Sequence, residues 1–237
     1  MPFVLLSLQP PSFLKAMELV SILLTIPAVL IALTVHECAH GYAAWRLGDP
    51  TARSLGRLSL NPLKHIDPIG AICMVFFRFG WAKPVPINTR YFKKPRRDMA
   101  ISAVCGPLAN FALAFFGAFL YTAFLLIFGP IMMRAGISRF LYLLLSYTLN
   151  FLYIFHFVNI TLGLFNCLPA PPLDGSRFFL VFLPPRIYFA VMRYERYIAL
   201  ALFLLLYLGV LDGLLLGAAN AISGGMLSLF RLIFGLS

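Results

Sequence analysis

The stretch LVSILLTIPAVLIALTVHECAH, residues 19–40, joins an uncharged apolar run to the pentad His36-Glu37-Cys38-Ala39-His40. One α-helical turn brings residues i and i+4 onto the same face, so His36 and His40 can offer two imidazole nitrogens to one metal ion, with Glu37 beside them. A catalytic zinc ion takes three protein ligands and keeps one position for water, so the chain must supply one further ligand. The stretch therefore predicts a metal site on an apolar helix.

The composition places this helix in a membrane. Of the 237 residues, 61% are hydrophobic and 11% charged, values typical of a polytopic membrane protein. A span needs about 20 apolar residues to cross about 30 Å of hydrocarbon. Two pieces, 173–183 and 218–236, could each be a buried half-helix, an interfacial helix or a return crossing. We expect an all-α polytopic bundle of about four to six transmembrane helices, with four assigned spans: Leu19–Trp45, Met99–Phe128, Phe140–Phe165 and Ile198–Leu216.

The net charge of +11 is unevenly distributed. Most lysines and arginines of the first hundred residues fall between the first two spans, whereas Lys15 alone precedes the first. By the positive-inside rule that loop is cytoplasmic. Lipid headgroups and topology already account for a basic cytoplasmic face, so we expect contact with membrane lipid and no nucleic-acid partner.

The depth of the pentad follows from this orientation. His36 lies ten residues before Arg46, which places it about 15 Å inside the cytoplasmic boundary at the rise of an α-helix. Ionisable groups are expensive to bury at such depth and indicate function. The alternative is a chance pentad on a core helix, with its histidines bonded to neighbouring hydroxyls and carbonyls.

The third ligand can be sought among the few acidic residues. Most acids lie at predicted helix ends or in basic loops, which leaves Asp174 and Asp212. Asp174 follows three prolines in four positions, 169–172, which forbid a regular helix and expose backbone groups that membrane proteins tolerate where they line a site. Asp174 is also on the same side of the membrane as the pentad. It is therefore the favoured ligand, and Asp212 is better explained as a helix-terminal or packing residue.

Three motifs in this order resemble the site-2 protease family of intramembrane zinc metalloproteases, peptidase family M50. They are the pentad, Gly106-Pro107-Leu108-Ala109-Asn110, and Asn166 to Gly175, which matches N-x-x-P-x-P-x-L-D-G. The stretch from Phe79 to Asn88 resembles the sequence of members of the compact prokaryotic branch of this family. The resemblance covers about residues 17–185 of a single membrane domain, 1–237, with C-terminal membrane helices in 186–237. The chain is too short to carry an inserted PDZ or CBS module.

The resemblance implies an endopeptidase that cuts within or near transmembrane segments of membrane proteins. It implies that His36, His40 and Asp174 hold one zinc ion per chain, that Glu37 is the general base and then acid, and that Asn166 holds the substrate backbone or the developing oxyanion. It also implies a prokaryotic inner membrane with the active site open to the cytoplasm. Whether the chain forms a homo-oligomer stays open.

Three further polar residues could orient a metal ligand or contact substrate. Asn110 follows the Gly106-Pro107 pair, which could serve only close helix packing, with the Asn110 amide bonded to a neighbouring backbone. His156 and Asn159 precede Asn166 on the same span and could orient a ligand, although a satisfied polar residue in a bundle is the simpler interpretation.

The stretch Val75–Tyr91 predicts a membrane-dipping β-hairpin. Its two strand-like parts are broken by Gly80 and Pro84. Because a substrate helix must unwind before cleavage, an exposed edge of this hairpin could pair with it as an added strand. The alternative is an ordinary amphipathic hairpin on the headgroups, anchored by Trp81 and Lys83.

Two other classes of function remain open. A metal transporter would use intramembrane ligands for a passing ion, but Glu37 beside His36 and a single ligand set favour chemistry over transit. A catalytically silent scaffold would lack a ligand or the base, and neither is missing from the sequence.

Overall fold

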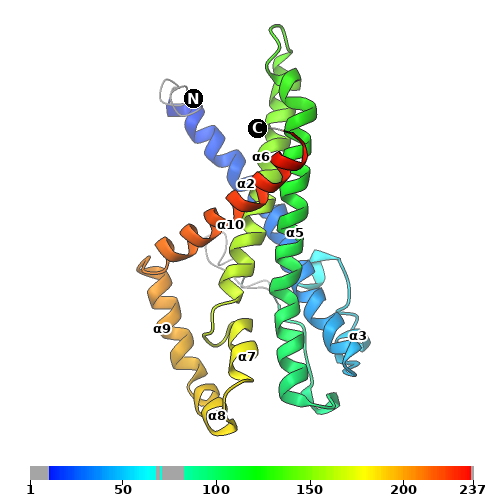
Figure 1. The fold of residues 1–237 in the computed structure, drawn as a ribbon, viewed down its shortest axis with the longest axis vertical. Coiled ribbons are helices and arrows are strands. Elements are labelled where there is room, and N and C mark those ends of the chain that lie inside the picture. The colour runs from blue at the N-terminus through cyan, green and yellow to red at the C-terminus, as the bar shows by residue number, and fades with distance from the viewer. Residues whose placement is uncertain (1–10, 68–69, 71–82, 236–237) are drawn as a thin grey trace.

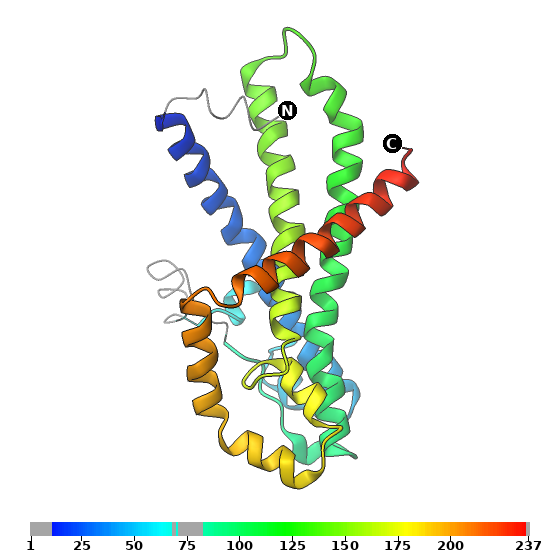
Figure 2. The same cartoon turned by 60° about the vertical axis from the view of Figure 1, so that its left-hand side comes forward.

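The computed structural model describes residues 11–67, 70 and 83–235, and every regular element within them is a helix (Figure 1). Three long helices form the core: α2 (Pro11–Arg46), α5 (Pro95–Met132) and α6 (Arg139–Asn166). α5 contacts both α2 and α6, and α5 and α6 run antiparallel as neighbours (Figure 2). α10 (Asp212–Ile233) crosses the outside of the α5–α6 pair.

Four of the described helices are long and apolar enough to cross a membrane: Leu19–Arg46 of α2, α5, α6 and α10. The first three agree with predicted spans. α5 has 38 residues, or about 57 Å of helix, so it is longer than the roughly 30 Å of hydrocarbon. The all-helical membrane bundle predicted from composition is therefore confirmed.

The prediction of a fourth span over Ile198–Leu216 is wrong. The chain forms α9 (Glu195–Tyr207), turns, and starts α10 at Asp212. The turn contains Gly209 with φ of +70°, a conformation that glycine adopts without a Cβ clash and that ends a helix. The piece 218–236, which the sequence left open, belongs mostly to the spanning helix α10.

The predicted β-hairpin over Val75–Tyr91 is not seen in its described part. Residues 75–82 lie outside the described residues. Residues 83–88 have irregular backbone, and η2 (Thr89–Tyr91) is a short 3₁₀ helix. Pro84 and Pro86 have no N–H, so this part cannot form a regular strand ladder.

Glycines allow the core helices to approach closely. A Cβ on Gly117 of α5 would lie 3.0 Å from the Phe155 ring and 3.1 Å from the Cα of His156, both on α6. A Cβ on Gly163 of α6 would lie 3.1 Å from the ring of Phe111 on α5. Small residues of this kind drive packing between membrane helices, where the hydrophobic effect contributes little.

The short elements gather at the lower end of the molecule in Figure 1. α7 (Asp174–Leu180) packs against α5, and α3 (Thr51–Ser54) and η1 (Pro62–Lys64) lie against α2. α8 (Pro185–Arg193) leads into α9 and has no buried residue. α3 and η1 thus lie against the helix that carries the pentad, and α7 lies on the neighbouring helix α5.

Candidate metal centre

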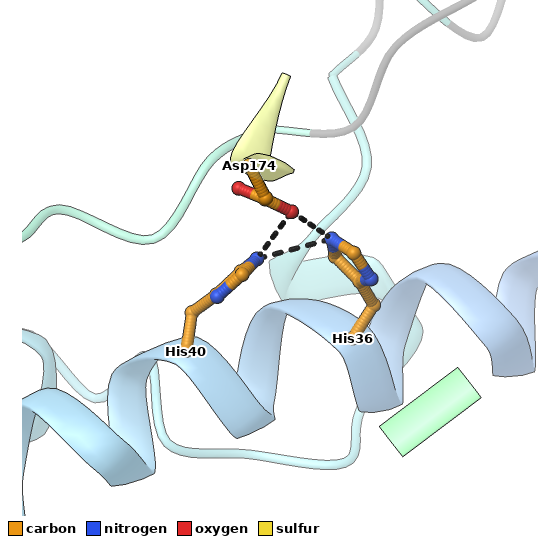
Figure 3. A group of neighbouring side chains, drawn as sticks. All are labelled: His36, His40 and Asp174. Atoms are coloured by element: carbon orange, nitrogen blue, oxygen red, sulfur yellow. Dashed lines mark hydrogen bonds and ion pairs between the residues drawn. The ribbon is translucent and has the colours of Figure 1, made fainter. Parts of the chain in front are cut away.

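Three ligand atoms from two distant parts of the chain meet at one point (Figure 3). The Nε2 atoms of His36 and His40, one turn apart on α2, lie 3.0 Å from each other. Each also lies 3.0 Å from Oδ2 of Asp174, the first residue of α7. Both histidines are buried, and Asp174 is largely buried. His36, His40 and Asp174 form the group of described residues that can hold a metal ion.

The tautomers of both histidines are set by their other ring nitrogens. Nδ1–H of His36 donates to Oδ1 of Asn110 at 2.6 Å, and Nδ1–H of His40 donates to the carbonyl oxygen of Ser102 at 2.8 Å. Because both Nδ1 atoms are donors, both neutral rings present an Nε2 lone pair to the common point.

The three facing atoms are suited to bind one cation together. Two Nε2 acceptors and a carboxylate at 3.0 Å repel one another without one. Zinc at about 2.0–2.1 Å from each ligand would set the ligand atoms of a tetrahedron about 3.3 Å apart, close to the observed spacing. The donor set therefore fits zinc, with two imidazole nitrogens and one carboxylate oxygen.

Asn110 ties the metal helix to two others. Its Nδ2 donates to the carbonyl oxygen of Ala32 on α2 at 3.2 Å and to Oδ1 of Asn159 on α6 at 2.9 Å. Asn159 in turn donates to the carbonyl oxygen of Phe155 at 2.8 Å. Asn110 and Asn159 are fully buried. The chain of amides fixes the ring orientation of His36, as outer partners of metal ligands commonly do.

Gly106 lets α5 approach the metal centre. A Cβ at this position would clash with both atoms Cε1 and Nε2 of His40 and would lie 2.8 Å from Cε1 of His36. The backbone of α5 therefore lies directly against both imidazoles, which only glycine permits here. Ser102 reinforces this approach, because its hydroxyl donates to the carbonyl oxygen of His40 at 2.9 Å.

The proline-rich loop before α7 delivers Asp174. A Cβ on Gly175 would clash with the carbonyl of Cys167 and would lie 2.5 Å from the carbonyl oxygen of Leu168, so the start of α7 is folded tightly against the end of α6. The carboxylate form of Asp174 is the form that binds a metal ion.

Glu37 lies beside the three ligands without joining them. Its Oε2 accepts a hydrogen bond of 2.7 Å from the backbone N–H of Val85. Glu37 is half-buried, whereas Val85 is buried. The carboxylate of Glu37 is thus held by Val85, which lies in the described part of the stretch predicted as a hairpin.

Asn166 and His156 have other partners. Nδ2 of Asn166 donates to the carbonyl oxygen of Leu162, one turn back on α6, at 3.0 Å. His156 bonds to the carbonyl oxygen of Ala114 at 2.7 Å and to Oγ of Ser223 at 2.9 Å, so it links α6 to α5 and α10. Within the described part of the chain, no hydrogen bond joins either residue to the three ligands. Of the three candidate orienting residues, the structure brings Asn110 and Asn159 to the metal centre and places His156 elsewhere.

Two contacts of the site were missed from sequence. Ser102 orients His40 through its backbone carbonyl, and Val85 holds Glu37 through its backbone N–H. Backbone groups leave no signature in residue type. The one available signal was Pro84-Val85-Pro86, in which Val85 alone carries an N–H.

Comparison with known proteins agrees with this geometry. The profile described as peptidase family M50 matches residues 123–211, which include the Asn166–Gly175 motif. The Bacillus subtilis (strain 168) protein named "Putative zinc metalloprotease YwhC" is 38% identical over 210 residues, which are 87% of this chain and 90% of that relative. The chain belongs to peptidase family M50.

More distant M50 relatives are longer. Proteins named "Putative zinc metalloprotease Rip2" from Mycobacterium tuberculosis (strain H37Rv) and Mycolicibacterium smegmatis are 29% and 30% identical over 154 and 161 residues. The matches cover 62% and 65% of this chain and 52% and 54% of those relatives. No solved structure matches the chain. Family and helices together make this M50 member a multi-pass membrane zinc protease.

Proposed function

We propose that the chain is an intramembrane endopeptidase that hydrolyses peptide bonds within or near transmembrane segments of membrane proteins. The observation that carries the proposal is the position of the metal centre. His36 and His40 lie on the spanning part of α2, with Asp174 brought against them by the loop after α6. Hydrophilic side chains on an apolar helix are costly to bury in a membrane, and residues kept there at such a cost indicate a functional site.

The residues divide the chemistry among them. His36, His40 and Asp174 would hold the zinc ion, and Asn110 and Ser102 orient the two rings. When bound, zinc supplies Lewis-acid polarisation of the scissile carbonyl and a water with a pKa of about 7. Glu37 takes a proton from the attacking water and passes it to the leaving amine.

Asn166 is proposed to hold the substrate backbone or the developing oxyanion. It lies at the last position of α6, directly before the loop that ends at Asp174. Its neutral amide can donate to an oxyanion without adding a buried charge. To do so, Nδ2 must exchange or share its bond to the Leu162 carbonyl.

An element within Val75–Tyr91 is proposed to pair with an unwound substrate. In the described part, the N–H of Val85 is held by Glu37, and the prolines on both sides have none. An added strand needs free N–H and C=O groups. Residues 84–86 therefore do not supply this edge.

The active site is proposed to open to the cytoplasm of a prokaryotic cell, from its inner membrane. α3, α8 and the start of α5 each contain basic residues and lie toward the lower end of the molecule in Figure 1. A basic end of this kind faces the cytoplasm by the positive-inside rule. Asp174 belongs to the same end, so a water path to the metal would start there.

The test is reconstitution in lipid vesicles with a panel of single-span membrane proteins, followed by mass-spectrometric mapping of each cut. We expect cleavage within or close to the apolar segment, blocked by a zinc chelator and restored by added zinc. Cuts confined to soluble tails would contradict the intramembrane assignment, even if the chain proved to be a zinc protease.

A further inference from the structure

The segment Lys83–Asn88, here called the strap, crosses α2 beside the catalytic pentad. We propose that the strap is the positioning element of the general base, and that Arg57 is the positioning residue that holds the strap in place. The inference rests on the proposed function, because it assigns a partner to Glu37 as base. Neither the sequence motifs nor the family assignment gives Arg57 or Val85 a role.

The contact with Glu37 is specific to one backbone group. Pro84 and Pro86 have no N–H, so Val85 is the one donor among the three residues, and it points at Oε2 of Glu37 over 2.7 Å. A backbone N–H that donates to a carboxylate makes a short, charge-assisted hydrogen bond. With one oxygen so held, the carboxylate of Glu37 keeps a fixed plane, and its other oxygen is left to accept the proton of the attacking water.

The Val85 side chain determines how closely the strap packs against α2. It is 7% exposed. A Cβ added to Gly41, one turn after Glu37, would lie 3.0 Å from Cγ1 of Val85 and 2.8 Å from Cδ2 of Leu58. The absence of a side chain at Gly41 lets Val85 rest on the helix, which brings its N–H within reach of Glu37.

Arg57 binds the backbone of the strap directly before Val85. Its Nη2 donates to the carbonyl oxygen of Lys83 at 2.6 Å and to that of Pro84 at 3.3 Å. The Pro84 carbonyl and the Val85 N–H belong to one planar peptide group. A hydrogen bond to the Pro84 oxygen therefore also restricts the direction of the Val85 N–H. Nε of Arg57 is buried without a hydrogen-bond partner among the described residues, a cost that the two hydrogen bonds of Nη2 have to offset.

The ends of the strap are held separately. The N–H of Lys83 donates to the carbonyl oxygen of His65 at 2.8 Å, and the N–H of Asn88 donates to Oδ2 of Asp49 at 2.7 Å. Asp49 is fully buried and also accepts from Thr51. These bonds keep the strap on α2, whereas Arg57 and Val85 act at its centre, where the base is.

The first experiment measures amide hydrogen exchange at single-residue resolution in lipid nanodiscs. We expect the Val85 amide to exchange about 10-fold faster or more in Glu37→Ala and in Arg57→Gln than in the wild type, since a lost charge-assisted bond exposes the N–H. The Asn88 amide, held by Asp49, is the internal reference and should not change in Glu37→Ala. Equal exchange of Val85 in wild type and Glu37→Ala would overturn the inference without any substrate.

The second experiment measures kcat, KM and bound zinc on the panel substrate that is cut fastest. Arg57→Gln should lower kcat about 10-fold or more with KM and zinc content unchanged, a part of the 10²–10⁴ that a positioned base contributes. Arg57→Lys keeps the charge and one donor and should retain more of kcat. Arg53→Gln is the matched control, because Arg53 belongs to the same basic loop but stacks on Trp45 and should leave kcat unchanged.

A double-mutant cycle separates positioning from general stability. In Glu37→Asp the shorter side chain loses its reach to Val85, so Arg57→Gln should then change kcat less than about twofold. An equal effect of Arg57→Gln in both backgrounds would refute the positioning role. Failure of the proposed function would look different: no cleavage of membrane spans by the wild type, with the Val85 amide still protected by Glu37.

Discussion

At the scale of single residues, the three side chains that meet in the candidate metal centre were predictable from the sequence, and their hydrogen-bond partners were only partly so. The i, i+4 spacing of His36 and His40 and the scarcity of acids near Asp174 are properties of the sequence. Asn110 was a candidate, but its bond to His36 depends on how α5 crosses α2. Ser102 and Val85 make their bonds through backbone groups, which every residue type has, so the sequence could not predict these two contacts.

Removal of the Asp174 charge should remove the metal. Asp174→Asn replaces an anionic ligand with a neutral amide, so we expect zinc affinity to fall by more than the roughly 10- to 100-fold that loss of an orienting partner costs. Zinc per chain, measured by elemental analysis after dialysis, checks this. Asp212→Asn, which changes the start of α10, should keep wild-type zinc. Full zinc in Asp174→Asn would exclude Asp174 as a ligand.

Asn110→Leu should weaken zinc binding while leaving all three ligands in place. Without the acceptor on Asn110, the ring of His36 loses its fixed tautomer and orientation, and we expect about a 10- to 100-fold loss of zinc affinity. Asn150→Leu is the control, since Asn150 also links α6 to α2, through Ser21 at 3.3 Å, away from the metal. Titration with a competing chelator measures both. Equal zinc affinity in the two variants would mean that Asn110 serves helix packing alone.

At the scale of elements, apolar length predicted three of the four spanning helices. Charged or proline-rich sequence lies at the ends of these helices, so their ends could be predicted approximately from the sequence. The break at Gly209 was missed because a single glycine in an apolar run is compatible with a continuous helix, and the positive φ is decided by the turn that redirects the chain into α10. The close approach of α5 to α2 follows from Gly106, whose motif suggested packing but not which atoms it would face.

Gly106→Ala should displace α5 from the metal centre. The added Cβ would clash with the His40 ring, so zinc affinity and proteolysis should fall together although alanine favours helix more than glycine does. Gly129→Ala on the same helix is the control, because among the described residues its Cβ would meet only Leu125, at 3.6 Å. Zinc content and thermal unfolding of both purified variants test this. If Gly106→Ala bound as much zinc as the wild type, α5 could move away from α2 without weakening metal binding, and this prediction would be wrong.

At the scale of the whole molecule, charge decides the proposed orientation. The two ends of the bundle carry different sequence: the turn between α5 and α6 at the upper end, and the basic loops around α3 and α8 at the lower end (Figure 1). Since the metal centre lies toward the lower end, orientation also decides from which side water and substrate tails arrive.

Cysteine labelling in sealed vesicles tests the orientation. Ser54→Cys in α3 should react with a membrane-impermeant maleimide added from the cytoplasmic side, and Ala135→Cys in the α5–α6 turn should react from the opposite side. Both positions are exposed, and the parent chain with its native cysteines gives the background. The reverse pattern would place the active site on the outer face.

The most direct test of Glu37 as the general base is the cleavage rate of Glu37→Gln at equal zinc occupancy. We expect this variant to bind zinc as the wild type does, because Glu37 is not among the three candidate ligands. We expect it to cleave a membrane-span substrate at least about 100-fold more slowly, because the proton of the attacking water has no acceptor. Wild-type cleavage by Glu37→Gln with zinc bound would contradict the mechanism at its centre.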